Sequence, residues 1–235
     1  MDGWFLIVAP DGWGLLLLRG AWLTLAVAAC GMALGAVLGL ALACARIAGG
    51  RWLRMLADAY TTVLRGVPDL LVIYLFYFGG SSILSALSGA FGHEGFTGMP
   101  TFATGALALG VVSAAYQAEV YRGAFQAVPR GQLEAARAMG FGDGLMLRRI
   151  VVPQAWRHAL PGLGNVWQLV IKESALVSVI GLVELLRAAQ VGAGSTRLPF
   201  AFYTAALLLY LVITSASGLL LVRAEARAQR PYRRA

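Results

Sequence analysis

The apolar run from Ala159 to Val183 contains only two charged residues, Lys172 and Glu173, which are adjacent near its middle. If the run crosses a membrane, an ionisable side chain at that depth costs about 2.5–3.5 kcal/mol on insertion scales and is a functional candidate by default. Glu173 could hold a cationic group. Ser174 and Ser178 are four residues apart, so on an α-helix their hydroxyls could face one pathway. Glu119, at the cytoplasmic end of another apolar run, could add negative charge.

Lys172 points in a different direction, because neighbouring residues on a helix lie about 100° apart. We expect it to be structural, in contact with backbone carbonyls at a helix break. A second interpretation stays open for both charged residues. Lys172 and Glu173 could satisfy partners at an interface with another subunit and contact no transported molecule.

Several other chemistries lack the residues that they need. A phosphate-binding loop requires Gly-x4-Gly-Lys-Ser/Thr, but the only lysine, Lys172, is followed by Glu173. The two histidines, His93 and His158, are far apart in the chain, which argues against a metal site. No nucleophile–histidine–carboxylate set is recognisable, although such sets assemble in space. We therefore expect no metal, no cofactor and no catalysis by this chain.

The two cysteines, Cys30 and Cys44, both fall in the first apolar run. At 1.5 Å per residue on a helix they share a face but lie about 21 Å apart, too far for a disulfide. We interpret them as buried packing residues.

Composition explains why so few residues are available for chemistry. Of the 235 residues, 59% are hydrophobic and 13% are charged, and the mean hydropathy is +0.73. Soluble domains carry about 25% charged residues, so the chain is predicted to be an all-α integral membrane protein with lipid as its solvent. The formal charge of +8 comes from arginines between the apolar runs, which favours control of topology over binding of nucleic acid. From the first residues, which lack a basic n-region, we expect no cleaved signal.

Five stretches are long enough to cross a bilayer, each near the 20 residues that a spanning helix needs. The second is expected to extend backwards towards Tyr60 and to break at Pro68 near the cytoplasmic face. The predicted spans are 20–45, 70–91, 95–118, 159–183 and 198–222.

Arginine placement predicts the orientation, since short cytoplasmic loops collect Lys and Arg. Fifteen of the nineteen basic residues fall on one predicted side. The N-terminus is therefore expected outside and the C-terminus in the cytoplasm of a bacterial inner membrane. The predicted parts are an external segment 1–18, a membrane domain 19–223 with a cytoplasmic loop at 122–158, and a basic tail 224–235.

The loop at 122–158 is too long to be a simple connection between helices. It is predicted to form a helix from Gln132 to Met139, a break at residues 140–142, and a second helix from Asp143 to Val152. Asp143 could cap the second helix and Pro153 could end it. Such an elbow is either a docking surface or an amphipathic helix resting on lipid.

The elbow carries a spaced motif. Glu134-Ala135-Ala136 is followed after three residues by Gly140, and after nine more by Ile150-x-Val152-Pro153. This resembles the EAA loop of ABC importer permeases, with Val152 in place of the usual leucine. The resemblance implies that the loop inserts into a cleft of a separate ATPase subunit. Small side chains at Ala135 and Ala136 would allow close approach, and Gly140 would allow a sharp bend.

Other segments extend the resemblance from about residue 20 to residue 223. The runs at 65–71, 121–132, 160–165 and 172–178 are similar to polar amino-acid permeases, and Pro68-Asp69-Leu70 resembles the Q-type subunits of histidine, lysine, arginine, ornithine and opine permeases. The resemblance implies a type-I ABC importer permease fold and transport of polar, above all basic, amino acids. It also implies three kinds of partner: an ATPase dimer, a sister or identical permease, and an extracytoplasmic substrate-binding protein. A secondary transporter or a membrane-embedded enzyme is the alternative, but the first usually has more spans and the second needs converging catalytic groups.

Overall fold

The computed structural model describes residues 12–90 and 98–229, and His93 lies outside this part. All regular elements of the described residues are helical. Their bounds are α2 Gly14–Ala48, α3 Arg51–Gly66, α4 Asp69–Tyr74, η1 Leu75–Gly79, α5 Gly80–Ala90, α6 Thr101–Gln126, α7 Arg130–Ala138, α8 Asp143–Met146, η2 Leu147–Val151, α9 Val152–Glu173, η3 Ser174–Ile180, α10 Leu185–Thr196 and α11 Pro199–Gln229.

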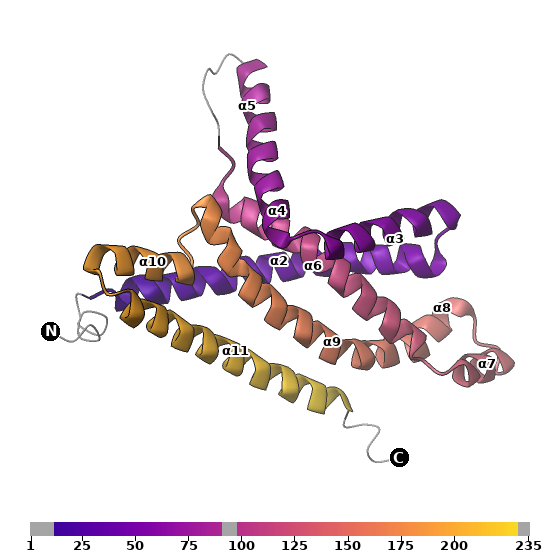
Figure 1. The fold of residues 1–235 in the computed structure, drawn as a ribbon. Helices are drawn as coiled ribbons and strands as arrows, with labels where there is room; N and C mark the ends of the chain where they lie inside the picture. Colours follow the sequence, from indigo (N-terminus) through magenta and orange to yellow (C-terminus); the bar gives the residue numbers. More distant parts are fainter. Residues whose placement is uncertain (1–11, 91–97, 230–235) are drawn as a thin grey trace.

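Five segments of the described chain are long and apolar enough to cross a membrane, which confirms the predicted all-α class and span number. They are Gly14–Ala48, Asp69–Gly89, Thr101–Gln126, Asp143–Ile180 and Pro199–Ala228. Helices α2, α6, α9 and α11 form the body, with α4 and α5 projecting from it (Figure 1). The start of α2 and the end of α11 lie at opposite ends of the body, as an odd number of crossings requires.

Small residues allow the closest helix pair, α2 and α6, to approach. Gly31, Gly35 and Gly39 are spaced four apart on α2 and all are buried. A Cβ on Gly39 would lie 2.9 Å from the carbonyl oxygen of Ala114, and a Cβ on Gly35 would overlap the Ser113 hydroxyl. Lipid provides no hydrophobic drive between helices, so backbone contact of this kind supplies the packing energy.

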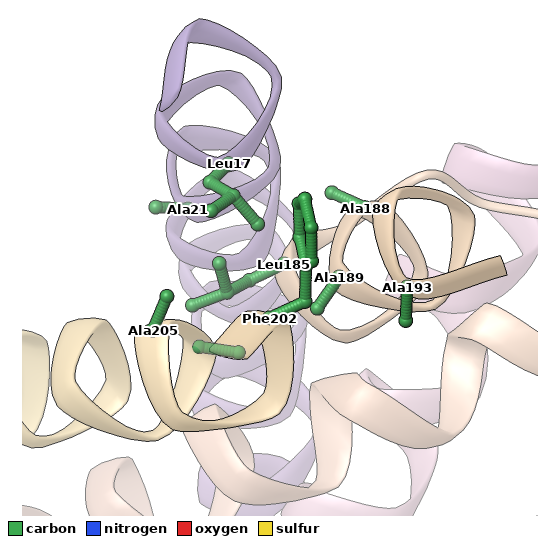
Figure 2. Packing of buried hydrophobic residues seen from close by; sticks show 9 residues of the cluster. Leu17, Ala21, Leu185, Ala188, Ala189, Ala193, Phe202 and Ala205 are labelled. Carbon is green, nitrogen blue, oxygen red and sulfur yellow. The ribbon is translucent and has the colours of Figure 1, made fainter. Parts of the chain in front are cut away.

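The short helix α10 was not predicted from the sequence. It packs between α2 and α11 through an apolar cluster centred on Phe202 and Leu185 (Figure 2). The Phe202 ring lies across Gly192, and a Cβ at that position would overlap the ring. This cluster fixes the chain between the fourth and fifth spans.

The second predicted span needs a correction. The chain breaks at Val67 and Pro68, whose backbones are extended. The break at Pro68 is confirmed, but the extension towards Tyr60 is wrong, because residues 51–66 form a separate helix, α3. A proline lacks the N–H that would continue the helix. Helix α3 packs on α2 and α6, where the Tyr60 hydroxyl donates to the Val111 carbonyl at 2.7 Å.

Three smaller expectations are also wrong. Pro153 does not end a helix, because it lies in the first turn of α9, where a missing N–H costs little. Asp143 is the first residue of α8 rather than its cap, and the cap position is Gly142. Cys30 and Cys44 are exposed rather than buried, so they lie on a face that this chain leaves open.

Candidate functional site

The segment that carries the candidate site changes helix type. Helix α9 ends at Glu173 and continues as a 3₁₀-helix over Ser174–Ile180, which ends at Gly181 with a φ of 96°. Residues three apart share a face in a 3₁₀-helix, so a spacing of four does not place Ser174 and Ser178 on one face. Both side chains are buried, and the Ser174 hydroxyl donates to the Ile171 carbonyl at 2.7 Å.

Glu173 carries an incompletely satisfied carboxylate. Its Oε2 atom is buried and has no hydrogen-bond partner in the described part of the chain. Asp69 lies close enough to act on the Glu173 carboxyl both by side-chain hydrogen bonding and by its charge. Asp69 begins α4 directly after the break at Pro68, and α4 packs against η3 and α6. Lys172 is exposed and takes no part in this pair.

Tyr116 of α6 lies within electrostatic range of Asp69, Glu173 and Arg65. The Arg65 guanidinium carbon lies 5.6 Å from the centroid of the Tyr116 ring, in cation–π geometry. Arg65, Asp69 and Tyr116 were not among the residues predicted for the site. Arg65 and Asp69 flank Pro68, and a helix break next to charges was the available signal.

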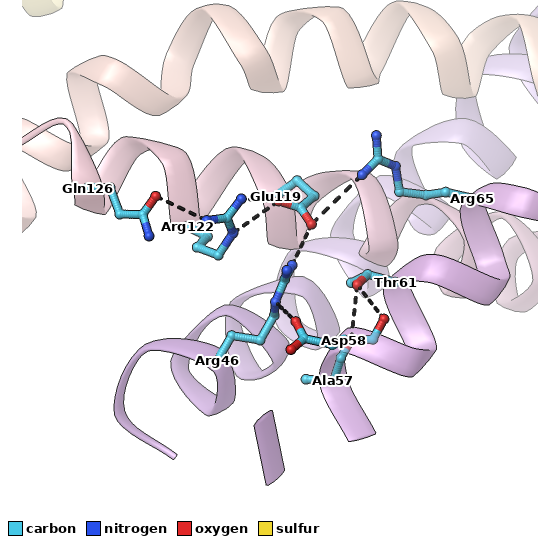
Figure 3. Close-up of polar contacts among 8 residues, drawn as sticks. All are labelled: Arg46, Ala57, Asp58, Thr61, Arg65, Glu119, Arg122 and Gln126. Carbon is cyan, nitrogen blue, oxygen red and sulfur yellow. Dashed lines mark hydrogen bonds and ion pairs between the residues drawn. The ribbon is translucent and has the colours of Figure 1, made fainter. Parts of the chain in front are cut away.

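Glu119 lies in a different environment, an ion-pair cluster that joins three helices (Figure 3). Its Oε1 accepts from Arg46 of α2 at 2.5 Å, and its Oε2 accepts from Arg122 Nη2 at 2.8 Å. Arg46 also pairs with Asp58 of α3 at 2.5 Å, and Arg65 lies 3.8 Å from Glu119 Oε1. Both oxygens of Glu119 therefore accept from arginines, unlike the unpartnered Oε2 of Glu173.

Glu184, which sequence reasoning also missed, is buried where α10 begins. Its carboxylate accepts from the backbone N–H groups of Leu186 at 2.9 Å and Arg187 at 2.8 Å, and from the Tyr210 hydroxyl at 2.9 Å. The Thr24 hydroxyl lies 3.3 Å away. Burial raises the pKa of Glu184, and these donors oppose that rise. The side chain ties α2, α10 and α11 together.

The segment predicted to be the elbow forms helix α7, a turn, and α8, which continues through η2 into α9. Gly140 has a φ of 79°, its N–H donates to the Arg137 carbonyl at 2.9 Å, and the Phe141 N–H donates to the Ala136 carbonyl at 3.0 Å. These bonds form a Schellman motif, whose left-handed position favours glycine. Its open surroundings show that the backbone angle, rather than crowding, requires glycine there.

The remaining motif residues divide between the elbow's surface and its interior. Glu134 and Ala135 are exposed, whereas Ala136 is buried, so Ala136 serves the elbow's own packing rather than the approach of another protein. Ile150 lies half-buried in the π-helical turn η2, and Pro153 is exposed. Hydrogen bonding between the side chains of Gln132 and Gln154, at 2.6 Å, ties α7 to α9.

Residues 12–90 and 98–229 hold no group of three or more His, Cys, Asp and Glu side chains that could bind a metal ion. The polar groups instead form the carboxylate pair with Tyr116 and Arg65, the Glu119 cluster and the Glu184 node. Among these three sets, the first can bind a charged molecule, because it keeps an unpartnered carboxylate oxygen.

Curated proteins resemble the chain over nearly its whole length. It is 58% identical over 225 residues to the octopine transport system permease protein of Rhizobium meliloti, covering 96% of this chain and 95% of the relative. It is 48% identical over 234 residues to the nopaline transport system permease protein of Agrobacterium fabrum, covering 99% of each. It is 39% identical over 216 residues to the histidine/lysine/arginine/ornithine transport system permease protein of Salmonella typhimurium, covering 92% and 94%.

Solved structures share the fold. A crystal structure of an amino acid ABC transporter with histidines matches with a TM-score of 0.79 and 33% identity, covering 92% of this chain and 95% of that one. An inward-facing methionine ABC transporter, MetNI, matches with a TM-score of 0.74 at 19% identity, over 97% and 99%, which supports the fold alone. The family model for the binding-protein-dependent transport system inner membrane component matches residues 31–229. With that match and these relatives, the chain belongs to the family of binding-protein-dependent transport system inner membrane components.

Proposed function

We propose that this permease subunit carries basic amino acids or their opine derivatives, and that Glu173 with Asp69 binds their cationic end. The buried, unpartnered Oε2 of Glu173 is the observation that carries the proposal. A buried carboxylate without a partner is costly unless a ligand supplies one. Curated relatives are named for transport of octopine, nopaline and the basic amino acids, all of which have a cationic or guanidinium group.

Ser174 and Ser178 are proposed to line the same pathway, since both lie in the 3₁₀ segment directly after Glu173, although on different faces of it. Glu119 was also predicted for the pathway. Its ion pairs with Arg46 and Arg122 favour a role in holding α2, α3 and α6 together beside that pathway.

The experiment for the substrate is uptake into proteoliposomes that contain the complete importer. Arginine, octopine and a neutral amino acid such as glutamine would be compared, each with its cognate binding protein. The proposal expects arginine or octopine to be imported and to stimulate ATP hydrolysis. Import of glutamine alone would contradict it.

The elbow is proposed to dock onto the ATPase subunits. Exposed Glu134 makes no hydrogen bond or ion pair with any described residue, so it is available to another protein. A sister or identical permease and an extracytoplasmic binding protein complete the proposed assembly. The α2–α3 turn, the elbow and the end of α11 point to the same end of the body (Figure 1). Their arginines support a cytoplasmic location for that end, with the N-terminus outside.

Gly140→Val tests the coupling role. A β-branched residue is strained at a φ of 79°, by about 1–2 kcal/mol, so the elbow should change shape. Gly142→Val is the matched control, because Gly142 lies in the same turn with open surroundings and an ordinary φ of −70°. We expect Gly140→Val to assemble in the membrane but to lose substrate-stimulated ATP hydrolysis, and the control to keep it. Wild-type transport by Gly140→Val would contradict the docking role.

A further inference from the structure

Arg65 makes a longer contact with Glu119 than Arg46 and Arg122 do. Arg46 and Arg122 each donate hydrogen bonds to Glu119 of 3.0 Å or shorter, and both are mostly buried. The Arg65 side chain is 47% exposed, its Nη1 lies 3.8 Å from Oε1 of the same carboxylate, and it donates no hydrogen bond to any described residue. Apart from this long ion pair, the N–H groups of the guanidinium can bind another acceptor.

The position of Arg65 places those donors next to the proposed cation site. Arg65 lies in the last turn of α3, and Asp69 begins α4 just beyond the break at Pro68. Tyr116, on which the guanidinium stacks, lies within electrostatic range of both Asp69 and Glu173. One tyrosine thus has a cation on one side and two carboxylates in its surroundings.

This charge pattern is complementary to an amino acid with a cationic side chain. Such a molecule carries a positive end that fits Asp69 and Glu173, and a carboxylate that would be left without a partner there. An arginine guanidinium binds carboxylates through two parallel hydrogen bonds, a geometry that a lysine cannot reproduce. The ring of Tyr116 preorganises the guanidinium plane.

We infer that Arg65 binds the carboxylate of the transported amino acid while Asp69 and Glu173 hold its cationic end. The inference rests on the proposed function, because it assumes that a cationic amino acid enters this site. If Arg65 has this role, the transported molecule must carry a free carboxylate. A dicarboxylated derivative would offer Arg65 a second acceptor.

The test uses two probes that differ only at the carboxylate, arginine and argininamide. Binding of each radiolabelled probe to the purified complete importer in detergent is measured without the binding protein, so that the specificity of that protein does not enter. For Arg65→Gln we expect arginine affinity to fall about tenfold to a hundredfold, the usual effect of losing a charge-assisted pair. Argininamide affinity should change by less than about threefold, because the amide offers no charged partner to lose. Arg65→Lys should fall between wild type and Arg65→Gln for arginine.

Arg54→Gln is the matched control, because Arg54 is exposed on the same helix and its substitution removes the same charge. It should leave both affinities unchanged. Equal losses of arginine and argininamide in Arg65→Gln would assign Arg65 a structural role and overturn the inference, as would no loss of either. If the wild-type importer binds neither probe, the proposed function itself fails. A loss confined to argininamide would contradict the assignment of Arg65 to the carboxylate of the substrate.

Discussion

Glu173 and Glu184 stand at the two ends of one short segment, and their surroundings are opposite. Glu184 is fully buried, yet it accepts hydrogen bonds from two backbone N–H groups and from the Tyr210 hydroxyl. Glu173 keeps a buried oxygen without any partner in the described chain. Both occur beside apolar packing, so burial alone does not distinguish them.

Hydrogen-bond satisfaction separates the structural carboxylate from the binding one. Glu184 uses its acceptors to cap α10 and to join α2 to α11, and nothing is left for a ligand. Glu173 leaves its acceptor in the same small region as Asp69, Tyr116 and Arg65. Removing Glu184 should damage the fold, whereas removing the charge of Glu173 should damage transport.

The largest expected effect follows from Glu184→Ala. The substitution leaves the Tyr210 hydroxyl and two backbone N–H groups unpaired in the interior, which should cost about 3 kcal/mol. The thermal unfolding midpoint of the purified protein measures it. Glu184→Gln, which keeps one acceptor oxygen, should lose less. An unchanged midpoint in Glu184→Ala would show that Glu184 does not stabilise the fold.

Glu173→Gln tests whether Glu173 acts in transport rather than in stabilising the fold. It keeps the shape and removes the charge, so uptake of a cationic amino acid should fall about tenfold, equivalent to about 1.4 kcal/mol of binding. The unfolding midpoint should stay at the wild-type value, because the lost oxygen has no partner in the described chain. Unchanged uptake, or loss only through failed assembly, would favour the interpretation in which Glu173 satisfies a neighbouring subunit. Asp69→Asn should reproduce the uptake defect if the two carboxylates act together.

The sequence predicted the parts of this fold that depend on long apolar runs and on proline or glycine. The five spans, the break at Pro68 and the turn around Gly140 each follow from local chemistry. The short helix α10 was missed because its residues Leu185–Thr196 are too few to form a span and carry no distinctive pattern. Exposed Cys30 and Cys44 were misjudged, because apolar residues facing lipid or another subunit look the same in sequence as buried ones.

The site was only partly predictable for a different reason. Glu173 stood out as a charge inside an apolar run, and the structure gives it a buried oxygen without a partner in the described residues. Its neighbours Asp69, Tyr116 and Arg65 come from three other helices, so no local spacing links them. Glu119 looked similar to Glu173 in sequence, and only the arrangement of α2, α3 and α6 brings arginines to it.

Glu119→Gln extends the comparison to a third carboxylate. Glu119 is paired with arginines, whereas Glu184 accepts from neutral donors. The change leaves Arg46, Arg65 and Arg122 with Asp58 as the one acidic partner among the residues of this cluster. We expect a loss of stability of about 1 kcal/mol, typical of a partly exposed ion pair. The difference from wild type should shrink at high salt, which screens the repulsion between the arginines. A salt-independent loss would point to packing rather than charge.

The smallest effect concerns the pH dependence of stability at Glu184. Burial raises its pKa in the folded protein above the ordinary value of 4.5, so the folded state binds this proton more tightly than the unfolded chain does. The resulting stabilisation is fully present below the ordinary pKa and is lost as the pH rises through the folded pKa. The effect is small because the backbone, Tyr210 and Thr24 donors favour the anion and so oppose burial. The unfolding midpoint of wild type relative to Glu184→Gln, measured from acidic to neutral pH, should fall over that window, since the amide does not titrate. A difference that rises with pH would mean that the hydrogen-bond donors outweigh burial, and that Glu184 is held as an anion.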